Sequence, residues 1–442
     1  MISFMKWNLR YCLIVVYNKI VLTKTYQLCR NYVFRFRYKH LPKSYESIRN
    51  NLIEKKKINV AFFIHDAAKW KYEGVYRCFE KDERFNPYIV IVPFAAGSVT
   101  GYNVEENMMK TYSYFKTTHK VCLPYDANSK KIFDIRGTEF EPDLIFYMNC
   151  WHEYGKYKQF SYRHNWDKLQ AYVPYAWMIS ARYIEHFNRD FHNCMWKIFY
   201  ETPLHVNMSK QYAINKGINA VSSGYPMLDV FFDSNYVPND SIWKKQGKRK
   251  KRIIWAPHHH IYEKNRCANF LFVYDLMIQL AKKYENEVQF IFRPHPELAK
   301  KLDFCVSGWN EQKRKEYYSV WENMPNTQIE LGDYIDMFLT SDALIQDCGS
   351  FTAEYLATGK PMLFMEANKE VIAGWNECGK AIASHLYLSD KGAGVEDFIQ
   401  NVVIAGQDSM LEQRLKFIEN YIRPKSGNAS LYIYEYIKQQ LS

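Results

Sequence analysis

Apolar runs of strand length alternate with helical stretches from residue 58 onward, and this alternation restricts the fold more than any other feature. Three mostly apolar runs are INVAFFIHD at 58–66, PYIVIVP at 87–93 and DLIFYMNC at 143–150. Strands that are buried on both faces read this way. Shorter candidate strands follow at 171–175 and 196–201, and residues 70–80 could form a helix between two strands. This pattern predicts a parallel sheet that helices cover on both faces.

A second series of the same kind begins at residue 253. Strands are predicted at 253–257, 288–294, 327–331, 343–347 and 361–365, and helices at 268–284, 311–321, 333–341 and 351–359. The two series predict an α/β protein with two Rossmann-type domains, whose parallel sheets face each other across a cleft. Open sheets of this type bind ligands at the carboxyl ends of their strands.

The boundary between the two series shows a change in composition. DSNYVPND at 233–240 is rich in turn residues, and KKQGKRKKR at 244–252 is a run of positive charge. A chain of 442 residues is also too long for one ordinary core. We expect a basic amphipathic segment at 1–57, an N-terminal Rossmann-like domain at 58–240, a basic linker at 241–252, a C-terminal Rossmann-like domain at 253–415 and a helical tail at 416–442.

The positive net charge is confined to one segment. Of the formal charge of +12, residues 1–57 contribute 13 Lys or Arg against two Glu, whereas the remaining chain is close to neutral. No excess charge is left to coat a nucleic-acid groove. We therefore expect no nucleic-acid partner.

The first 57 residues interleave these cations with apolar side chains. The run YCLIVVY at 11–17 is interrupted by Asn18 and Lys19, so it is too short to span a bilayer. No small-residue cleavage site of a secretory signal follows it. The pattern predicts a basic helix on an anionic membrane surface, and the alternative is a helix packed on the body of the protein. The ten cysteines form no CxxC pair, which favours a cytoplasmic protein.

Three consecutive histidines, His258 to His260, follow the strand predicted at 253–257. Neighbouring side chains of a strand point to opposite faces, so a contiguous triplet is poor geometry for zinc. We therefore predict no metal site and no obligatory cofactor. A divalent cation stays open, although the sequence shows no cluster of protein ligands for one.

Polar residues gather where the strands of the second series end. Arg293 and His295 lie in the stiff turn RPHP, and arginine offers a planar fork that suits phosphate oxygens. His258 and His259 end the neighbouring strand, ahead of His260 in our expectation. We predict that these four side chains bind a diphosphate.

A second group follows the strand at 343–347. Asp347, Gly349 and Ser350 precede a predicted helix, where free N–H groups favour an anion and serine can cap the first turn. Glu354 lies about one turn further into that helix. We expect Asp347 or Glu354 to contact ribose hydroxyls. The chain contains no Walker loop and no GxGxxG motif.

Several of these segments resemble a known family in its order along the chain. GYP at 224–226 with Asp229, IIWAPHHH at 253–260, FRPHP at 292–296, DALIQDCGSFTAEYLATGKP at 342–361 and KSGNAS at 425–430 resemble the motifs of the CDP-glycerol glycerophosphotransferases, which build teichoic-acid-like and capsular polyol-phosphate polymers. The likeness covers about residues 200–435. It implies a GT-B fold, a CDP-polyol donor bound by the C-terminal domain, an acceptor bound by the N-terminal domain, and peripheral association with the cytoplasmic face of the bacterial inner membrane.

The resemblance also implies an activity. It implies transfer of a polyol phosphate, most simply glycerol phosphate, from a CDP-activated donor to a hydroxyl of a membrane-linked glycan or polyol-phosphate acceptor, with release of CMP. By the same likeness His295, Asp347 and Ser350 contact the diphosphate and nucleotide. The chain departs from the family at YVPYAW, residues 172–177, where a histidine-containing HGTPxK motif is common, and at residues 347–350, where DYSS is common.

A proton acceptor for the attacking hydroxyl must come from elsewhere. His65 and Asp66 directly follow the first strand and are the nearest candidates, with His152 next. Two other functions stay open. One is a GT-B glycosyltransferase that uses a nucleotide sugar, because one fold hosts both chemistries. The other is an inactive membrane-bound scaffold for surface-polymer assembly.

Overall fold

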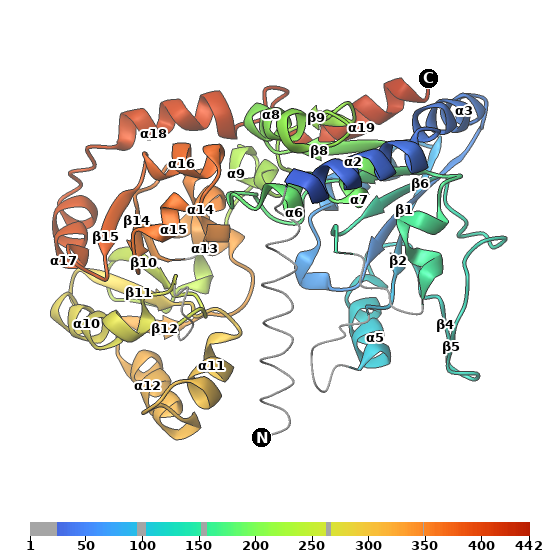
Figure 1. The fold of residues 1–442 in the computed structure, drawn as a ribbon. Helices are drawn as coiled ribbons and strands as arrows, with labels where there is room; N and C mark the ends of the chain where they lie inside the picture. Colours follow the sequence, from blue (N-terminus) through green and yellow to red (C-terminus); the bar gives the residue numbers. More distant parts are fainter. Residues whose placement is uncertain (1–23, 95–102, 152–156, 262–266, 348) are drawn as a thin grey trace.

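The computed structural model describes residues 24–94, 103–151, 157–261, 267–347 and 349–442. It consists of two lobes, each built around a parallel sheet (Figure 1). We call them the N-terminal lobe, whose sheet strands lie between residues 58 and 222, and the C-terminal lobe, whose sheet strands lie between 251 and 390. The predicted α/β architecture with two Rossmann-type sheets is confirmed.

The sheet of the N-terminal lobe has seven strands in the order β3-β2-β1-β6-β7-β8-β9. Its central strands are apolar and buried on both faces, which explains the long apolar runs in the sequence. The strands are β1 (Ile58–Ile64), β2 (Phe85–Ile91), β3 (Val121–Cys122), β6 (Leu144–Tyr147), β7 (Leu169–Tyr172), β8 (Lys197–Tyr200) and β9 (Ala220–Ser222). A small hairpin of β4 (Tyr125–Asp126) and β5 (Lys131–Ile132) lies apart from this sheet.

The sheet of the C-terminal lobe has six parallel strands in the order β12-β11-β10-β13-β14-β15. They are β10 (Lys251–Ala256), β11 (Val288–Phe292), β12 (Thr327–Ile329), β13 (Ala343–Gln346), β14 (Met362–Glu366) and β15 (Tyr387–Asp390). Strand order reverses between β10 and β13, as it does between β1 and β6 in the other lobe. Doubly wound sheets bind ligands at this point of reversal, beyond the carboxyl ends of the strands.

Helices cover both sheets. In the N-terminal half of the chain they are α2 (Lys24–Tyr38), α3 (Leu41–Ile53), α4 (Glu73–Glu80), α5 (Val104–Phe115), α6 (Tyr183–Phe187), α7 (Asp190–Cys194), α8 (Pro203–Tyr212) and α9 (Asp229–Phe232). Those that follow are α10 (Phe270–Lys283), α11 (Leu298–Cys305), α12 (Glu311–Asn323), α13 (Ile335–Thr340), α14 (Gly349–Leu356), α15 (Glu370–Ala373), α16 (Glu377–Ala383), α17 (Val395–Asp397), α18 (Leu411–Phe417) and α19 (Ala429–Gln440). Two π-helical segments, at Phe398–Ile404 and Ile418–Ile422, continue α17 and α18.

The loop after β7 contacts the C-terminal lobe. The Asn376 side chain donates to the Met178 carbonyl at 2.7 Å, and the Asn376 N–H donates to the Ile179 carbonyl at 2.7 Å. An isolated antiparallel bridge joins Ser180 to Trp375. Because the β7 loop leaves the carboxyl end of its strand, the carboxyl edge of the N-terminal sheet faces the C-terminal lobe.

The last helix returns to the N-terminal lobe. Both carboxylate oxygens of Asp229 accept backbone N–H groups at the start of α19, from Ala429 at 2.7 Å and Ser430 at 2.9 Å. The Tyr434 hydroxyl then donates to Asp82 at 2.7 Å. Figure 1 shows α19 lying over the N-terminal lobe, with the C-terminus near α3. The expected tail at 416–442 is helical over α19.

The charged linker is partly inside the C-terminal lobe. β10 begins at Lys251, so the last two residues of the expected linker belong to this strand. Arg252 is buried, its guanidinium pairs with Asp240, and it lies over the Trp243 ring at 5.1 Å. The N-terminal segment is also partly integrated, because Leu41, Tyr45 and Leu52 of α3 are buried and the Tyr45 hydroxyl donates to the Cys194 carbonyl at 2.7 Å.

Candidate functional site

Four imidazole rings meet beyond the carboxyl ends of β10 and β11. The ring centroid of His258 lies 4.2 Å from that of His259, 4.7 Å from that of His260 and 5.0 Å from that of His295. His259 and His295 are 4.1 Å apart. The predicted convergence of His258, His259 and His295 is therefore present, and His260 joins them.

The geometry of the triplet differs from our expectation. β10 ends at Ala256, so Pro257 and the three histidines lie beyond the strand and the alternation of side chains does not apply to them. A turn gathers all three rings on one side. The spacing argument against metal geometry assumed an extended strand and does not hold here.

Burial favours the neutral form of His258, His259 and His295. Burial, followed by the neighbouring imidazoles, lowers the pKa of His258 to about 2 and that of His259 to about 3. Burial also lowers the pKa of His295. Neutral imidazole carries one N–H and one lone pair, so each ring can donate to a phosphate oxygen or bind a metal ion.

The orientation of His295 follows from its backbone surroundings. Its N–H donates to the Pro257 carbonyl at 3.0 Å, which ties the RPHP turn to the end of β10. Its Nδ1 accepts the Glu297 N–H at 3.1 Å, so the proton of the neutral ring lies on Nε2. His295 therefore presents a fixed N–H donor.

Arg293 shares a small cavity with His295. The cavity has a volume of about 70 Å³ and is lined by both residues together with Ala256, Pro257, Pro294, Pro296, Leu331 and Phe351. The guanidinium donates to the carbonyls of Glu330 at 3.3 Å and Gly332 at 2.7 Å. These bonds leave part of its five-donor fork for a ligand.

Asp347 joins two backbone segments of the site by hydrogen bonds. It is buried, and its two oxygens accept the N–H of His258 at 2.6 Å and the N–H of Asn269 at 2.5 Å. Burial raises the pKa of Asp347 to about 6, and the two N–H groups oppose that rise. The structure thus uses Asp347 to hold the backbone at His258 and Asn269, and its predicted contact with the nucleotide stays a prediction.

The start of α14 lies against the other lobe. A Cβ on Gly349 would come within 2.8 Å of Ile179 Cδ1, so glycine permits the close approach of the β7 loop to this helix end. Ser350 begins the helix with Gly349. Its predicted capping and phosphate contacts concern a side chain outside the part of the chain that the structure describes.

Glu354 is enclosed one turn further into α14. It is buried, and burial raises the pKa of its carboxyl to about 7 while a hydrogen bond from Tyr334 opposes the rise. Its predicted ribose contact stays a prediction.

The two predicted catalytic residues end β1 in the N-terminal lobe. His65 is buried, its ring stacks on Phe94 at 4.2 Å, and burial lowers its pKa to about 3. Its Nε2 has no hydrogen-bond partner among the described residues. Asp66 caps a short turn by accepting the Ala68 N–H at 3.1 Å and pairs with Lys69 at 3.7 Å. His152 lies outside the described residues.

Sequence reasoning missed two buried charges near the carboxyl edge of the N-terminal sheet. Lys71 is buried, donates to the Met148 carbonyl at 2.6 Å and has a pKa that burial holds well below its ordinary value. Glu201 follows β8, is buried, and has a pKa raised by burial. Strongly shifted groups of this kind are enriched at functional sites. A glutamate that directly follows the apolar run KIFY is the signal that could have identified Glu201.

Comparisons with known proteins agree with this architecture. A family model described as CDP-Glycerol:Poly(glycerophosphate) glycerophosphotransferase matches residues 146–439, about two thirds of the chain. No curated protein sequence gives a significant match.

Solved structures share the fold at low identity. The chain is similar to a UDP-N-acetylglucosamine 2-epimerase, with 13% identity, a TM-score of 0.55, and coverage of 87% of this chain and 96% of the other. It is similar to the wall teichoic acid polymerase TagF, with 16% identity, a TM-score of 0.53, and coverage of 95% and 97%. A TagF variant soaked with CDPG matches at 14% identity and a TM-score of 0.51, with coverage of 95% and 98%. These likenesses show a common GT-B-like fold.

Proposed function

Because this chain belongs to the CDP-glycerol:poly(glycerophosphate) glycerophosphotransferase family, we propose that it transfers glycerol phosphate from CDP-glycerol to a hydroxyl of a membrane-linked glycan or polyol-phosphate acceptor. CMP is the second product. The polymer is teichoic-acid-like or capsular. The observation that carries the proposal is the convergence of His258, His259, Arg293 and His295 beyond the carboxyl ends of β10 and β11, next to the point where strand order reverses in the C-terminal sheet.

The reaction places specific demands on this group of side chains. The acceptor oxygen forms a bond to the glycerol-bearing phosphorus while the phosphoanhydride bond breaks, and its electron pair leaves with CMP. Negative charge on the diphosphate must be neutralised as it moves to the leaving group. The Arg293 fork and the fixed Nε2–H of His295 supply donors for this task.

The proton of the acceptor hydroxyl needs a base in the other lobe. We assign this role to His65, because it directly follows β1 and its Nε2 has no hydrogen-bond partner among the described residues. Asp66 lies at the same edge of the sheet, where it caps the turn that follows β1.

Removal of the His295 side chain tests the donor site. His295→Ala should abolish CMP release from CDP-glycerol in the presence of a membrane acceptor, because the fixed donor on the diphosphate is lost. The matched control is His164→Ala, because His164 is exposed and lies in the N-terminal lobe, distant from His295 in the sequence. This variant should keep full activity. Full activity of folded His295→Ala with every CDP-polyol would overturn the assignment.

Two competing functions give different products in the same assay. Release of a nucleoside diphosphate from a nucleotide sugar would identify a glycosyltransferase, because one fold hosts both chemistries. Absence of any nucleotide-induced shift in melting temperature would instead favour an inactive scaffold. The same shift, measured with CDP-glycerol and CDP-ribitol, ranks the polyols.

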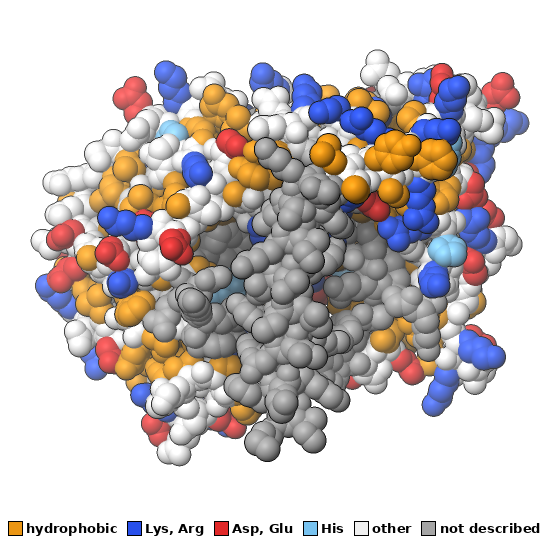
Figure 2. Space-filling view, in the orientation of Figure 1, with side chains coloured by type: hydrophobic (Ala, Val, Ile, Leu, Met, Phe, Trp, Pro, Cys, Tyr) orange, Lys and Arg blue, Asp and Glu red, His pale blue; other side chains and the backbone are white. Residues whose placement is uncertain are grey.

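The exposed face of α2 supports peripheral membrane association. Leu28, Tyr32, Val33 and Phe36 are 68%, 76%, 59% and 71% exposed and recur at helical spacing. Figure 2 shows apolar side chains over this helix, flanked by Lys and Arg. None of the helices in the described ranges is long and apolar enough to cross a bilayer. Apolar side chains with basic neighbours suit the anionic surface of the cytoplasmic leaflet.

Substitution on this face tests the membrane proposal without touching the core. Tyr32→Glu with Phe36→Glu should reduce flotation with anionic liposomes, because two exposed apolar side chains are replaced by negative charge. Phe304→Glu is the control, since Phe304 is 84% exposed but lies in α11 of the C-terminal lobe. Equal flotation of all three proteins would contradict the proposal.

A further inference from the structure

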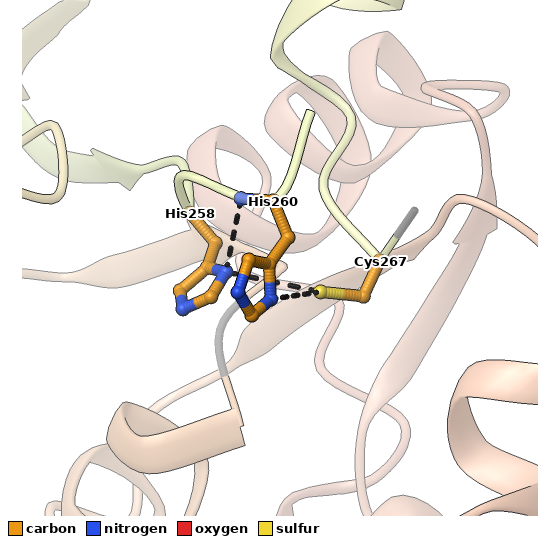
Figure 3. Close-up of side chains that lie close together, drawn as sticks. All are labelled: His258, His260 and Cys267. Carbon is orange, nitrogen blue, oxygen red and sulfur yellow. Dashed lines mark hydrogen bonds between the residues drawn. The ribbon is translucent and has the colours of Figure 1, made fainter. Parts of the chain in front are cut away.

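A sulfur atom lies beside the histidine cluster. Cys267 Sγ is 3.5 Å from His260 Nδ1 and 3.8 Å from His258 Nδ1 (Figure 3). The three potential ligand atoms lie within 4.8 Å of one another, and each residue is partly exposed. Figure 3 shows the three side chains pointing toward one another from the two ends of the loop that follows β10.

We propose that His258, His260 and Cys267 form a binding site for a divalent cation of the zinc class. Imidazole nitrogen with thiolate sulfur is the donor set that zinc and related soft cations prefer. Tetrahedral zinc, with bonds of about 2.3 Å to sulfur and 2.0–2.1 Å to nitrogen, places these atoms about 3.6 Å apart. The two measured sulfur–nitrogen distances lie on either side of this value.

The surrounding backbone brings the ligands together before any ion binds. Asp347 accepts the N–H of His258 and the N–H of Asn269, and so holds both ends of the loop. The Ala268 N–H donates to the His260 carbonyl at 3.3 Å, which draws Cys267 toward the histidine. A site whose ligands are held by buried hydrogen bonds needs little rearrangement on binding.

A second group of three, His258, His259 and His295, is also within ligand distance. His295 Nδ1 accepts the Glu297 N–H, so its Nε2 carries the proton and has no lone pair for an ion. In His258, Nδ1 accepts the His260 N–H at 3.4 Å, which is a weaker hydrogen bond than the one to His295 Nδ1. The unprotonated nitrogen of His258 is therefore Nδ1, on the side of Cys267. The cation therefore belongs to the set that contains sulfur.

Binding of the ion is a balanced exchange. The Cys267 thiol releases one proton to solvent, the thiolate and two neutral imidazoles donate electron pairs, and no electron is transferred. Three protein ligands leave the fourth position of a tetrahedral ion open, as in zinc sites that exchange ligands. This inference does not rest on the proposed function.

Cobalt(II) provides a test that needs no substrate. The full chain, reduced and free of metal, is titrated with Co²⁺ while the near-ultraviolet thiolate-to-metal band and the visible bands are recorded. We expect one ion per chain, a band from the sulfur ligand, and displacement of cobalt by Zn²⁺. Zn²⁺ alone should raise the melting temperature.

Matched variants identify the ligands. Cys267→Ser should abolish the sulfur band and weaken Co²⁺ binding more than about 100-fold, beyond the usual effect of an outer partner. His260→Ala should weaken binding comparably. Cys305→Ser, at an exposed cysteine, and His259→Ala should keep band and stoichiometry. Circular dichroism checks the fold of each variant.

Three outcomes would overturn the site. They are absence of stoichiometric Co²⁺ and Zn²⁺ binding to the folded wild type, a sulfur band that survives in folded Cys267→Ser, and a band that His259→Ala removes. None of these measurements depends on CMP release. A failure of the proposed function is thus distinguishable from a failure of the cation site.

Discussion

Asp347 shows how one buried side chain can organise the backbone around a site. Both of its oxygens accept backbone N–H groups, and the residue is buried. In Asp347→Asn the amide nitrogen would oppose one of these donors. A buried donor without an acceptor costs about 1–3 kcal/mol. We expect the free energy of unfolding in urea to fall by this amount. We also expect binding at the cation site and at the donor site to weaken.

The control for this prediction is Asp397→Asn, at an exposed aspartate of α17. It should leave the unfolding midpoint unchanged. Equal stability of Asp347→Asn and wild type would show that the two N–H groups find other acceptors.

Glu354 predicts a specific pH dependence of stability. Its folded-state pKa of about 7 lies above the ordinary value of 4.5 because of burial. Between these pH values the folded protein keeps a proton that the unfolded chain loses, so this group stabilises the fold at low pH and its contribution falls as the pH rises. The free energy of unfolding of wild type minus that of Glu354→Gln should fall by roughly 2–3 kcal/mol from pH 4.5 to 7.5.

The subtraction matters because the cluster histidines act in the opposite direction. Their lowered pKa values destabilise the fold as the pH falls below the ordinary value of 6.5. They are present in both proteins, so their effect cancels. Glu370→Gln, at an exposed glutamate, should give a flat difference. A flat difference for Glu354→Gln would contradict the raised pKa.

Individual residues could be predicted from the sequence where a short motif holds them. His295 and Arg293 follow from the RPHP turn, and both line one cavity. Cys267 could not be predicted as a neighbour of His260, because the contact depends on the path of the loop between them. The two backbone hydrogen bonds of Asp347 could not be predicted, since a motif gives the position of a carboxylate and not its hydrogen bonds.

At the scale of the element, Asp229 predicts how α19 is attached. Asp229→Ala removes both acceptors for the N–H groups of Ala429 and Ser430. Loss of such a cap costs about 0.5–2 kcal/mol, because the two N–H groups lose their acceptors. We expect faster proteolysis at the C-terminus and a lower unfolding midpoint.

Glu412→Gln, at an exposed glutamate of α18, is the matched control and should be cleaved at the wild-type rate. Unchanged protease resistance of Asp229→Ala would mean that α19 is held by its apolar face alone.

Strands in the middle of each sheet could be predicted because burial on both faces makes them uniformly apolar. The runs predicted at 58–66, 288–294 and 343–347 contain β1, β11 and β13. The strands β3, β9 and β15 were missed. Two of them have only two or three residues, and β15 alternates between buried and exposed positions at the edge of its sheet.

At the scale of the molecule, the contact between lobes should control the chemical step more than donor binding. A Cβ on Gly379 would lie 2.8 Å from the Ile179 carbonyl oxygen. This oxygen belongs to the backbone, so it cannot move away without shifting the chain. Gly379→Ala should separate the lobes, and the residues that we propose to bind the donor all belong to the C-terminal lobe. We expect kcat to fall at least about tenfold, since small misplacements are costly, while CDP-glycerol affinity stays unchanged.

Gly247→Ala is the control, because a Cβ there meets nothing within 4 Å. Calorimetry gives the affinity, and CMP release gives kcat. An equal loss of affinity and kcat would mean that the N-terminal lobe binds the donor as well. The two-lobe layout followed from the double alternation in the sequence, whereas this contact did not, because the loop after β7 has no pattern that marks its partner.

The return of α19 to the first lobe also bears on the order of folding during synthesis. The strands and helices between 251 and 404 form one uninterrupted stretch, so the core of the C-terminal lobe can fold as soon as that stretch leaves the ribosome. The N-terminal lobe is translated first but is completed last, because residues 429–440 supply one of its helices. A premature stop codon shortly before residue 429 would therefore leave the later lobe intact and the earlier one unfinished.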